Sequence, residues 1–400
     1  MLLAVVAGRL SGTSASIGGV TFYELYNFVG QLFLNALTLV VIPLIASAVI
    51  SGAARMGHQA GRLGAKTFAC FVGINFLALL IGLAVSLLIH DFVTFPESVD
   101  VELTLPQAVE SSTFAKIESV FFKLIPTNLF AAAASGQILG VIAFCFLFGF
   151  FLNRNGERQR NTLTDFWQGT FDTLMGVTEF IMRALPIGVF ALVAKVIAST
   201  GIQTLLSAIW LLIIMVAAIT LYIFVVLPLL LYFTGRIQPV PFYRALAPAL
   251  LTAFSTSSSA ATLPVLMECV EKDVGVPNRI AGFTLPLGSA FNMAGTTMFC
   301  IVAVLFVAQA YHAPLEGPTL LLAALMSFLV SFGMAGIPSA SLVAVVVVLT
   351  TMGLPAEGIG LLMPVERIVD MLRTLTNSLS NGCTATLVAR LEKEPLSNVT

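Results

Sequence analysis

A row of polar side chains interrupts an otherwise apolar segment near the C-terminal end of the chain. Glu366, Asp370, Arg373, Asn377 and Asn381 follow one another at intervals of 4, 3, 4 and 4 residues. Residues three and four apart share one face of a helix, so these five side chains are predicted to form a single stripe. A charged side chain at the middle of a membrane helix costs about 2.5 to 3.5 kcal/mol, so we expect the stripe to face the protein interior.

Two interpretations of Asp370 and Arg373 are open. One is a structural ion pair that binds nothing, although such a pair is seldom more stable than an apolar substitute of the same shape. The other is a site for a small zwitterion, in which the guanidinium takes a carboxylate, Asp370 accepts from an ammonium group, and Asn377 donates and accepts. We favour the zwitterion site. It requires that Asp370 and Arg373 do not neutralise each other and that a water-filled hollow lies beside them.

Two other polar stretches are candidates to complete the site. STSSSAATLP, 255 to 264, offers hydroxyls and backbone N–H groups at a helix start, although serine-rich turns are usually ordinary loops. FTLPLGSAFNMAGTTMF, 283 to 299, carries Asn292 and Thr296 in an apolar run broken by proline and glycine. It is either a kinked packing helix or an unwound segment whose carbonyls face a cation.

The composition indicates an integral membrane protein. Of 400 residues, 58% are hydrophobic and 10% charged, against roughly a quarter charged in a soluble domain. The net charge of -1 gives no reason to expect nucleic acid. The five cysteines form no CxxC pair and the three histidines are isolated, so we expect no disulfide framework, metal site or cofactor. With no base beside a nucleophile in the stripe, we expect no catalytic residues and no enzyme.

Apolar runs predict membrane-spanning helices, and two segments predict helical hairpins that enter the membrane and return. We read the N-terminal ten residues as the tail of a shortened first helix. The two hairpins lie at about 241–272 and 318–357, each with apolar arms around a polar tip. The other predicted spans are 22–54, 64–90, 121–152, 165–197, 203–235, 279–311 and 358–391.

Basic residues predict the orientation, because Lys and Arg collect in short cytoplasmic loops. If each hairpin enters and leaves by the same face, all four basic clusters fall on one side. We therefore expect a multi-pass protein of the inner (cytoplasmic) membrane with a cytoplasmic C-terminus. The clusters are Arg55 with Arg62 and Lys66, Arg154 with Arg158 and Arg160, Arg236 with Arg244, and Arg390 with Lys393.

Four motifs, in this order, resemble the glutamate transporter family, the dicarboxylate/amino acid:cation symporters. They are SSSAATLP, FTLPLGSAFNMAGT, GIPSAS and DMLRTLTNSLSN, and the likeness runs from about 22 to 393. The resemblance implies an all-α membrane protein with eight transmembrane helices and two re-entrant hairpins, built as inverted repeats. It also implies a homotrimer in contact with lipid, working as an elevator. Scaffold helices 1–2 would occupy 1–61 and helices 4–5 would occupy 121–197. The mobile transport domain would comprise 62–92, with helix 3, and 201–393.

The resemblance also assigns roles to particular residues. Arg373 would hold the substrate's side-chain carboxylate, Asp370 its amino group, and Asn377 with the serine tip its main carboxylate. The aspartate favours glutamate or aspartate over plain dicarboxylates. The implied substrate-binding set is Ser258, Ser259, Thr296, Ile337, Asp370, Arg373, Thr374 and Asn377.

The chain departs from the family pattern where the coupling ion is expected. Ala294 replaces the aspartate of the usual NMDGT motif, and Asn381 replaces the acid that ligates sodium in sodium-driven members. Three positions of the third helix that help to form the same cation site in the family are occupied here by Phe71, Ile74 and Asn75. At least two sodium sites therefore look dismantled. A third sodium site, built mostly of backbone near Met293 and Ser331 to Met334, is left as an open alternative.

We therefore predict an acidic amino acid symporter, bacterial in type, driven by protons in preference to sodium. Burial favours the neutral form of a carboxylic acid, so Glu366, Asp370 or the substrate would carry the proton. The alternatives are sodium coupling through the backbone-built site, a C4-dicarboxylate carrier, and a channel or sensor that binds without pumping. The candidate coupling residues are Asn292, Met293, Ser331, Met334, Glu366, Asp370 and Asn381.

Overall fold

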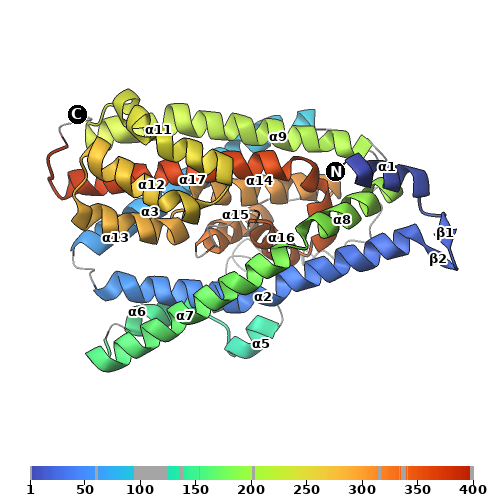
Figure 1. The fold of residues 1–400 in the computed structure, drawn as a ribbon, viewed down its shortest axis with the longest axis horizontal. Helices are drawn as coiled ribbons and strands as arrows, with labels where there is room; N and C mark the ends of the chain where they lie inside the picture. The colour runs from blue at the N-terminus through green and yellow to red at the C-terminus, as the bar shows by residue number, and fades with distance from the viewer. Residues whose placement is uncertain are drawn as a thin grey trace.

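The computed structural model is almost entirely helical (Figure 1). It describes residues 2–58, 62–93, 125–134, 138–152, 154–200, 203–313, 317–332, 334, 339 and 341–396. The first part contains α1 (Leu2–Ser11), β1 (Ser16–Ile17), β2 (Val20–Thr21), α2 (Phe22–His58), α3 (Arg62–Ile89), the 3-10 turn η1 (His90–Phe92), α5 (Leu129–Ala134), α6 (Ile138–Leu152), α7 (Glu157–Met182) and α8 (Leu185–Thr200).

The second part contains the helices that carry the candidate site. They are α9 (Gln203–Leu221), η2 (Tyr222–Val226), α10 (Leu227–Leu230), η3 (Leu231–Gly235), α11 (Pro239–Thr256), α12 (Ser259–Glu268), η4 (Cys269–Val274), α13 (Asn278–Phe291), α14 (Ala294–Ala310), α15 (Pro318–Ser331), α16 (Ser341–Thr351), η5 (Ala356–Leu361) and α17 (Met363–Leu391).

Long apolar helices confirm an integral membrane protein in coarse terms. Three helical runs in the described residues are long and apolar enough to cross a bilayer: Leu63–Ile89, Ser207–Gly235 and Asn278–Ala310. The second run stays helical through Pro228 by adopting π-helical turns on either side of α10. Such wider turns accommodate a residue that has no N–H to donate.

The helices pack in two groups. In the first, α2 packs against α6, α7 and α8, and α1 packs on α8. In the second, α17 packs against α3, α9, α11, α13 and α14, while α14 also contacts α15 and α16. Figure 1 shows α2, α6 and α7 along one side of the bundle that holds α9, α11, α14 and α17. The two groups are joined by contacts of α16 with α2 and of α8 with α9.

Both predicted hairpins consist of two packed helices. The arms of hairpin 1, α11 and α12, contact each other and meet at Ser257, whose φ of 53° turns the chain. The arms of hairpin 2, α15 and α16, also contact each other. Most of the hairpin 2 tip, including Ile337, lies outside the described residues.

The all-α fold class is confirmed for the described residues, with one local exception: a two-stranded ribbon in which β1 pairs with β2 across Gly18 and Gly19, both of which have the positive φ that a tight hairpin turn requires. Two of the predicted spans are wrong in detail. The segment 165–197 is not one helix, because α7 ends at Met182 and α8 begins beside Pro186. Pro186 has no backbone N–H, so it cannot donate a helical hydrogen bond to the carbonyl oxygen four residues earlier.

The second difference lies in the segment 121–152. Residues 125–128 are not helical, and α5 begins only at Leu129. The Asn128 side chain accepts from the backbone N–H groups of Phe130 and Ala131 at 2.9 and 3.1 Å. That contact caps the helix start and fixes its position.

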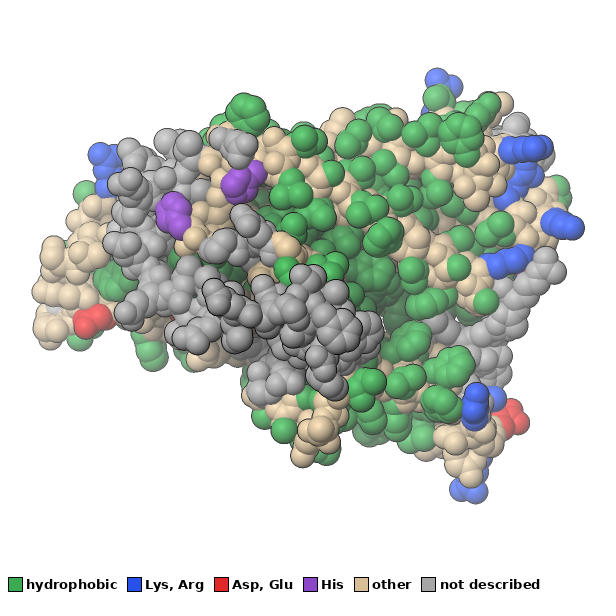
Figure 2. All heavy atoms as spheres, turned by 180° about the vertical axis from the view of Figure 1, so that it is seen from behind, with side chains coloured by type: hydrophobic (Ala, Val, Ile, Leu, Met, Phe, Trp, Pro, Cys, Tyr) green, Lys and Arg blue, Asp and Glu red, His purple; other side chains and the backbone are tan. Residues whose placement is uncertain are grey.

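Charged side chains gather at the ends of the molecule. On the face shown in Figure 2, Lys and Arg side chains concentrate at one end, and the described surface between the ends is mostly hydrophobic. This distribution is typical of a protein whose middle lies in hydrocarbon.

Candidate substrate site

The polar stripe of α17 faces the protein interior, as its spacing predicts. Glu366, Asp370, Arg373, Thr374, Asn377 and Asn381 are all buried, with exposed fractions between 1% and 7%. The helices that pack on α17 include α3, α9, α11, α12, α13 and α14, and the stripe also makes hydrogen bonds to α14 and to Ser339 of hairpin 2.

Asp370 and Arg373 form an ion pair, so the expectation that they stand apart is wrong. Arg373 Nη2 donates to Asp370 Oδ1 within the same helix. The second oxygen of Asp370, Oδ2, accepts from the backbone N–H of Ser339 at 2.9 Å. Side chains three residues apart on a helix are neighbours, and in a buried stripe pairing is the cheapest way to balance both charges.

The remaining surroundings of Arg373 leave part of its buried guanidinium without a hydrogen-bond partner among the described residues. The group lies 5.6 Å from the centre of the Phe299 ring, a cation–π contact from α14. Its Nε has no hydrogen-bond partner within the described part of the chain. A buried N–H without an acceptor is costly, so it indicates a place for an acceptor atom.

Asn377 caps the start of α14 from a neighbouring helix. Its Oδ1 accepts from the backbone N–H groups of Gly295 and Thr296 at 2.8 and 3.3 Å. Its Nδ2 lies 3.3 Å from Thr296 Oγ1 and 3.3 Å from Met293 Sδ. Gly295 makes this closeness possible, because a Cβ there would lie 2.5 Å from the Arg373 carbonyl oxygen. Thr296 and Asn377 are therefore brought together as predicted.

The serine tip of hairpin 1 is built around a left-handed residue. Ser258 accepts from the Ala261 N–H at 3.2 Å and caps α12, while Ser259 is buried. Ser257 is 1% exposed, and its Oγ has no hydrogen-bond partner in the described chain. The tip therefore holds a buried hydroxyl, in addition to the predicted serines.

The break between α13 and α14 lies at Asn292 and Met293, where the sequence predicts an interruption. Neither residue has helical dihedral angles. Both are buried, as are Ser331 and Met334. Asn381 Oδ1 lies against Gly288 of α13, where a Cβ would approach to 2.4 Å, and has no hydrogen-bond partner among the residues described. The interruption of the helix at these two residues is confirmed.

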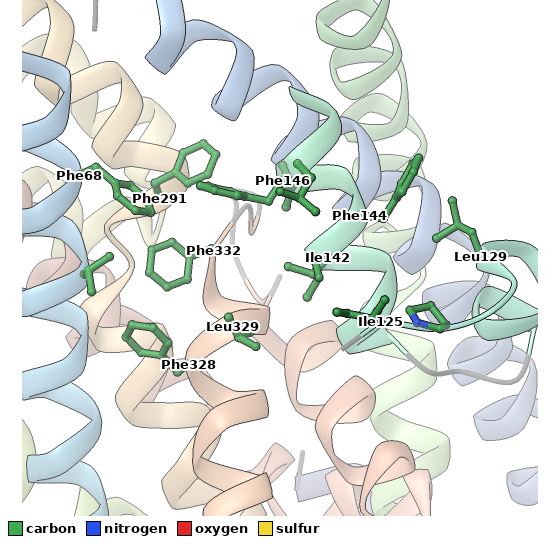
Figure 3. Close-up of a pocket in the computed structure, with 16 residues that line it drawn as sticks. Phe68, Ile125, Leu129, Ile142, Phe144, Phe146, Phe291, Phe328, Leu329 and Phe332 are labelled. Atoms are coloured by element: carbon green, nitrogen blue, oxygen red, sulfur yellow. The ribbon is translucent and has the colours of Figure 1, made fainter. Parts of the chain in front are cut away.

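A cavity of about 550 Å³ lies away from these polar groups. Figure 3 shows Phe68, Phe291, Phe328 and Phe332 on one side of it, and Ile142 and Phe146 of α6 on the other. Its lining is apolar, so it is not the water-filled hollow that the sequence argument expects. It lies between the two groups of helices.

Comparison with known proteins decides the family. The family model described as "Sodium:dicarboxylate symporter family" matches residues 1–391. The chain belongs to the sodium:dicarboxylate symporter family. The resemblance drawn from the four motifs is thereby confirmed.

Named relatives fall into two substrate classes. The chain is 32% identical over 369 residues, covering 91% of it and 85% of the relative, to "Proton/sodium-glutamate symport protein" of Bacillus subtilis (strain 168). It is 32% identical over 371 residues, with coverage of 91% and 84%, to "Proton/glutamate-aspartate symporter" of Escherichia coli (strain K12). It is 31% identical over 373 residues, with coverage of 91% and 82%, to "C4-dicarboxylate transport protein" of Rhodopseudomonas palustris (strain BisB5).

Several residues around this symporter's stripe were missed by sequence reasoning. Ser339 belongs to the noted GIPSAS motif, but only the folded hairpin brings its N–H to Asp370. Phe299 carries no signal in an apolar helix. Thr297 and Thr384 read as ordinary small residues, although each hydrogen-bonds a buried asparagine. For Thr297 and Thr384, the sequence signal that could have identified them was a single polar residue inside an apolar span.

Proposed function

We propose that this protein is a secondary active transporter that imports glutamate or aspartate by cation symport. The pairing of Asp370 with Arg373 does not meet the requirement set out from the sequence, so the observation that carries the proposal is the burial of the whole polar stripe of α17 against Ser339 of hairpin 2. The names of the glutamate and glutamate-aspartate relatives support this substrate class.

The ion pair suits a zwitterion because the charges can exchange partners. A substrate carboxylate can replace Asp370 at the Arg373 guanidinium, and a substrate ammonium can replace Arg373 at Asp370. Each buried charge then keeps an opposite charge beside it, which avoids the several kcal/mol cost of an unpaired ion. A substrate with only one charge sign leaves one of the two groups unpaired.

The other contacts assigned to substrate follow from the same geometry. Thr296, Thr374 and Asn377 lie on the buried helices beside the pair. Ser258 and Ser259 occupy the start of α12, where backbone N–H groups and the helix dipole favour a carboxylate. Ile337 completes the proposed set from the tip of hairpin 2.

We assign the coupling ion to a proton. Glu366 is 7% exposed, and its Oε1 has no hydrogen-bond partner among the described residues, so a protonated carboxyl suits that position. Sodium bound by backbone near Met293, Ser331 and Met334 is the competing assignment. The dicarboxylate relative supports a carrier of plain C4-dicarboxylates as the second candidate.

The two packed groups of helices suit an elevator. The α1, α2, α5–α8 group would be the scaffold, and α3 with α9–α17 would be the moving unit. Eight spans, inverted repeats, two re-entrant hairpins, a homotrimer and a cytoplasmic C-terminus in the inner membrane complete the proposal. The gathering of basic side chains at one end supports the orientation.

Transport into proteoliposomes tests the function. Labelled glutamate or aspartate should accumulate under an inward proton gradient, and labelled substrate should exchange against unlabelled substrate in counterflow. Accumulation under a sodium gradient alone would overturn the proton assignment. Binding without counterflow would reject a carrier in favour of a sensor, and preferential uptake of succinate would favour the dicarboxylate candidate.

A further inference from the structure

Asn75 occupies an unusual place in the middle of α3. It is fully buried in an apolar span. Its amide nitrogen Nδ2 is directed at three oxygens: Phe71 O at 2.8 Å, Asn292 Oδ1 at 3.0 Å and Phe291 O at 3.4 Å. One of these belongs to Asn292 in the break between α13 and α14, and another to Phe291, the last residue of α13, so one side chain of α3 hydrogen-bonds to the chain at that break.

The contacts of Asn75 continue as a chain of neutral groups. Asn75 Oδ1 accepts from Thr297 Oγ1 at 3.1 Å, and that hydroxyl lies 2.7 Å from Ser331 Oγ of α15. On the other side, Asn292 Nδ2 donates to Thr384 Oγ1 of α17 at 2.9 Å. This series of hydrogen bonds links α3, the helix break, hairpin 2 and α17, and none of its members is a carboxylate.

Three oxygens that converge on one point form a good environment for a small cation or for hydrogen-bond donors. A cation in this buried place would need negative charge or more oxygen ligands. The amide supplies two hydrogens, enough for the two nearer oxygens, and it adds no net charge among neutral groups.

We infer that the Asn75 amide fills, from within the chain, the position between these oxygens that a cation or another hydrogen-bond donor would otherwise occupy. The break between α13 and α14 is thereby held together without an ion, and Asn75 is the positioning residue that makes it independent of sodium. This inference deepens the proposed function by removing one coupling ion, and its consequence for transport rests on that proposal.

The isosteric variant Asn75→Asp tests the inference on the purified full-length protein. It replaces the NH₂ group with an oxygen, so four oxygens would meet without hydrogens, and a proton or a cation becomes necessary. In choline chloride at alkaline pH, we expect Tm to fall by roughly 4 °C or more relative to the unmodified protein. Sodium chloride at equal ionic strength, or mildly acidic pH, should restore most of that loss.

Asn128→Asp is the matched control, because Asn128 caps α5 through its oxygen and an aspartate preserves that contact. Its Tm should depend on salt and pH as that of the unmodified protein does. An Asn75→Asp variant whose Tm loss is absent, or is the same in every salt and pH, overturns the inference.

A second variant covers the case in which Asn75→Asp does not fold. Asn75→Ser leaves one hydroxyl and space between the oxygens, so its Tm should respond to sodium chloride over choline chloride more than that of the unmodified protein does. An equal response overturns the inference. Failure of the proposed function would instead appear as absent uptake and no Tm shift with glutamate, readouts that do not enter this comparison.

Discussion

At the scale of single residues, the central feature is that Asp370 and Arg373 satisfy each other inside the protein. A buried pair of this kind contributes little net stability, but removal of one partner leaves an uncompensated charge and costs about 3 to 5 kcal/mol. The same energetics let a ligand with both charges replace the pair at small cost. The proposed function therefore predicts selectivity for zwitterions, because each buried charge must stay paired.

Arg373 is expected to be essential for acidic substrates. Arg373→Lys keeps the charge but loses the planar fork, so glutamate binding should weaken by roughly 10- to 100-fold, and Arg373→Cys should abolish it. Glutamate binding measured by calorimetry checks this, with the exposed Arg279→Lys as control. Unchanged affinity in Arg373→Lys would exclude a bidentate contact.

Asp370 is expected to distinguish amino acids from dicarboxylates. Asp370→Asn removes the negative charge that pairs with an ammonium group, so the affinity for aspartate should fall at least 10 times more than that for succinate. Competition binding with both ligands measures the ratio. Equal losses for both would contradict the ammonium contact.

Glu366 is expected to carry the proton. Glu366→Gln keeps the shape of a protonated carboxyl but cannot release a proton, so counterflow exchange should persist while accumulation driven by a pH gradient is lost. The two assays on the same proteoliposomes separate these steps. Accumulation at the unmodified rate would assign the proton to another group.

At the scale of helices, the close approach of α14 to α17 depends on Gly295. A methyl group there would lie 2.5 Å from the Arg373 carbonyl oxygen and would separate Asn377 from the N–H groups it caps. Gly295→Ala should therefore lower stability by about 1 to 3 kcal/mol. Thermal unfolding in detergent checks this. Gly176→Ala in α7, where a Cβ meets nothing within 4 Å, should be neutral or slightly stabilising.

Periodicity and breakers predicted most of these helices, and particular residues show why the rest escaped. The stripe of α17, the serine-centred hairpin and the break at Asn292 follow from local spacing. The end of α7 at Met182 was missed, although Pro186 could have signalled it. The Ser339 contact to Asp370 and the Asn75 network join residues distant in sequence, so no local pattern carries them.

At the scale of the whole molecule, the apolar cavity between the helix groups offers a way to test relative movement. It is lined by Ala143 of α6 on one side and by Phe328 of α15 on the other. A larger side chain in the cavity would fix the position of one helix group relative to the other. The residues of the polar stripe do not line this cavity.

Ala143→Trp is expected to separate binding from transport. Uptake should fall by at least 10-fold while the glutamate affinity changes less than 3-fold, because a moving unit needs the space and the site does not. Uptake and calorimetric binding on the same preparation measure both. The control is Phe150→Trp, at an exposed position of the same helix outside the cavity lining. Equal uptake in both variants would count against relative motion at this surface.

The neutrality of the Asn75 network also bears on how membrane voltage acts on the protein. An elementary charge that crosses the full potential exchanges about 2.3 kcal/mol per 100 mV with the electric field. Hydroxyls and carboxamides between α3, α15 and α17 exchange none, so an inside-negative potential does no work on that part of the molecule. Among the groups of the site, the charge that moves through the membrane potential is then that of Glu366, Asp370, Arg373 and the bound substrate.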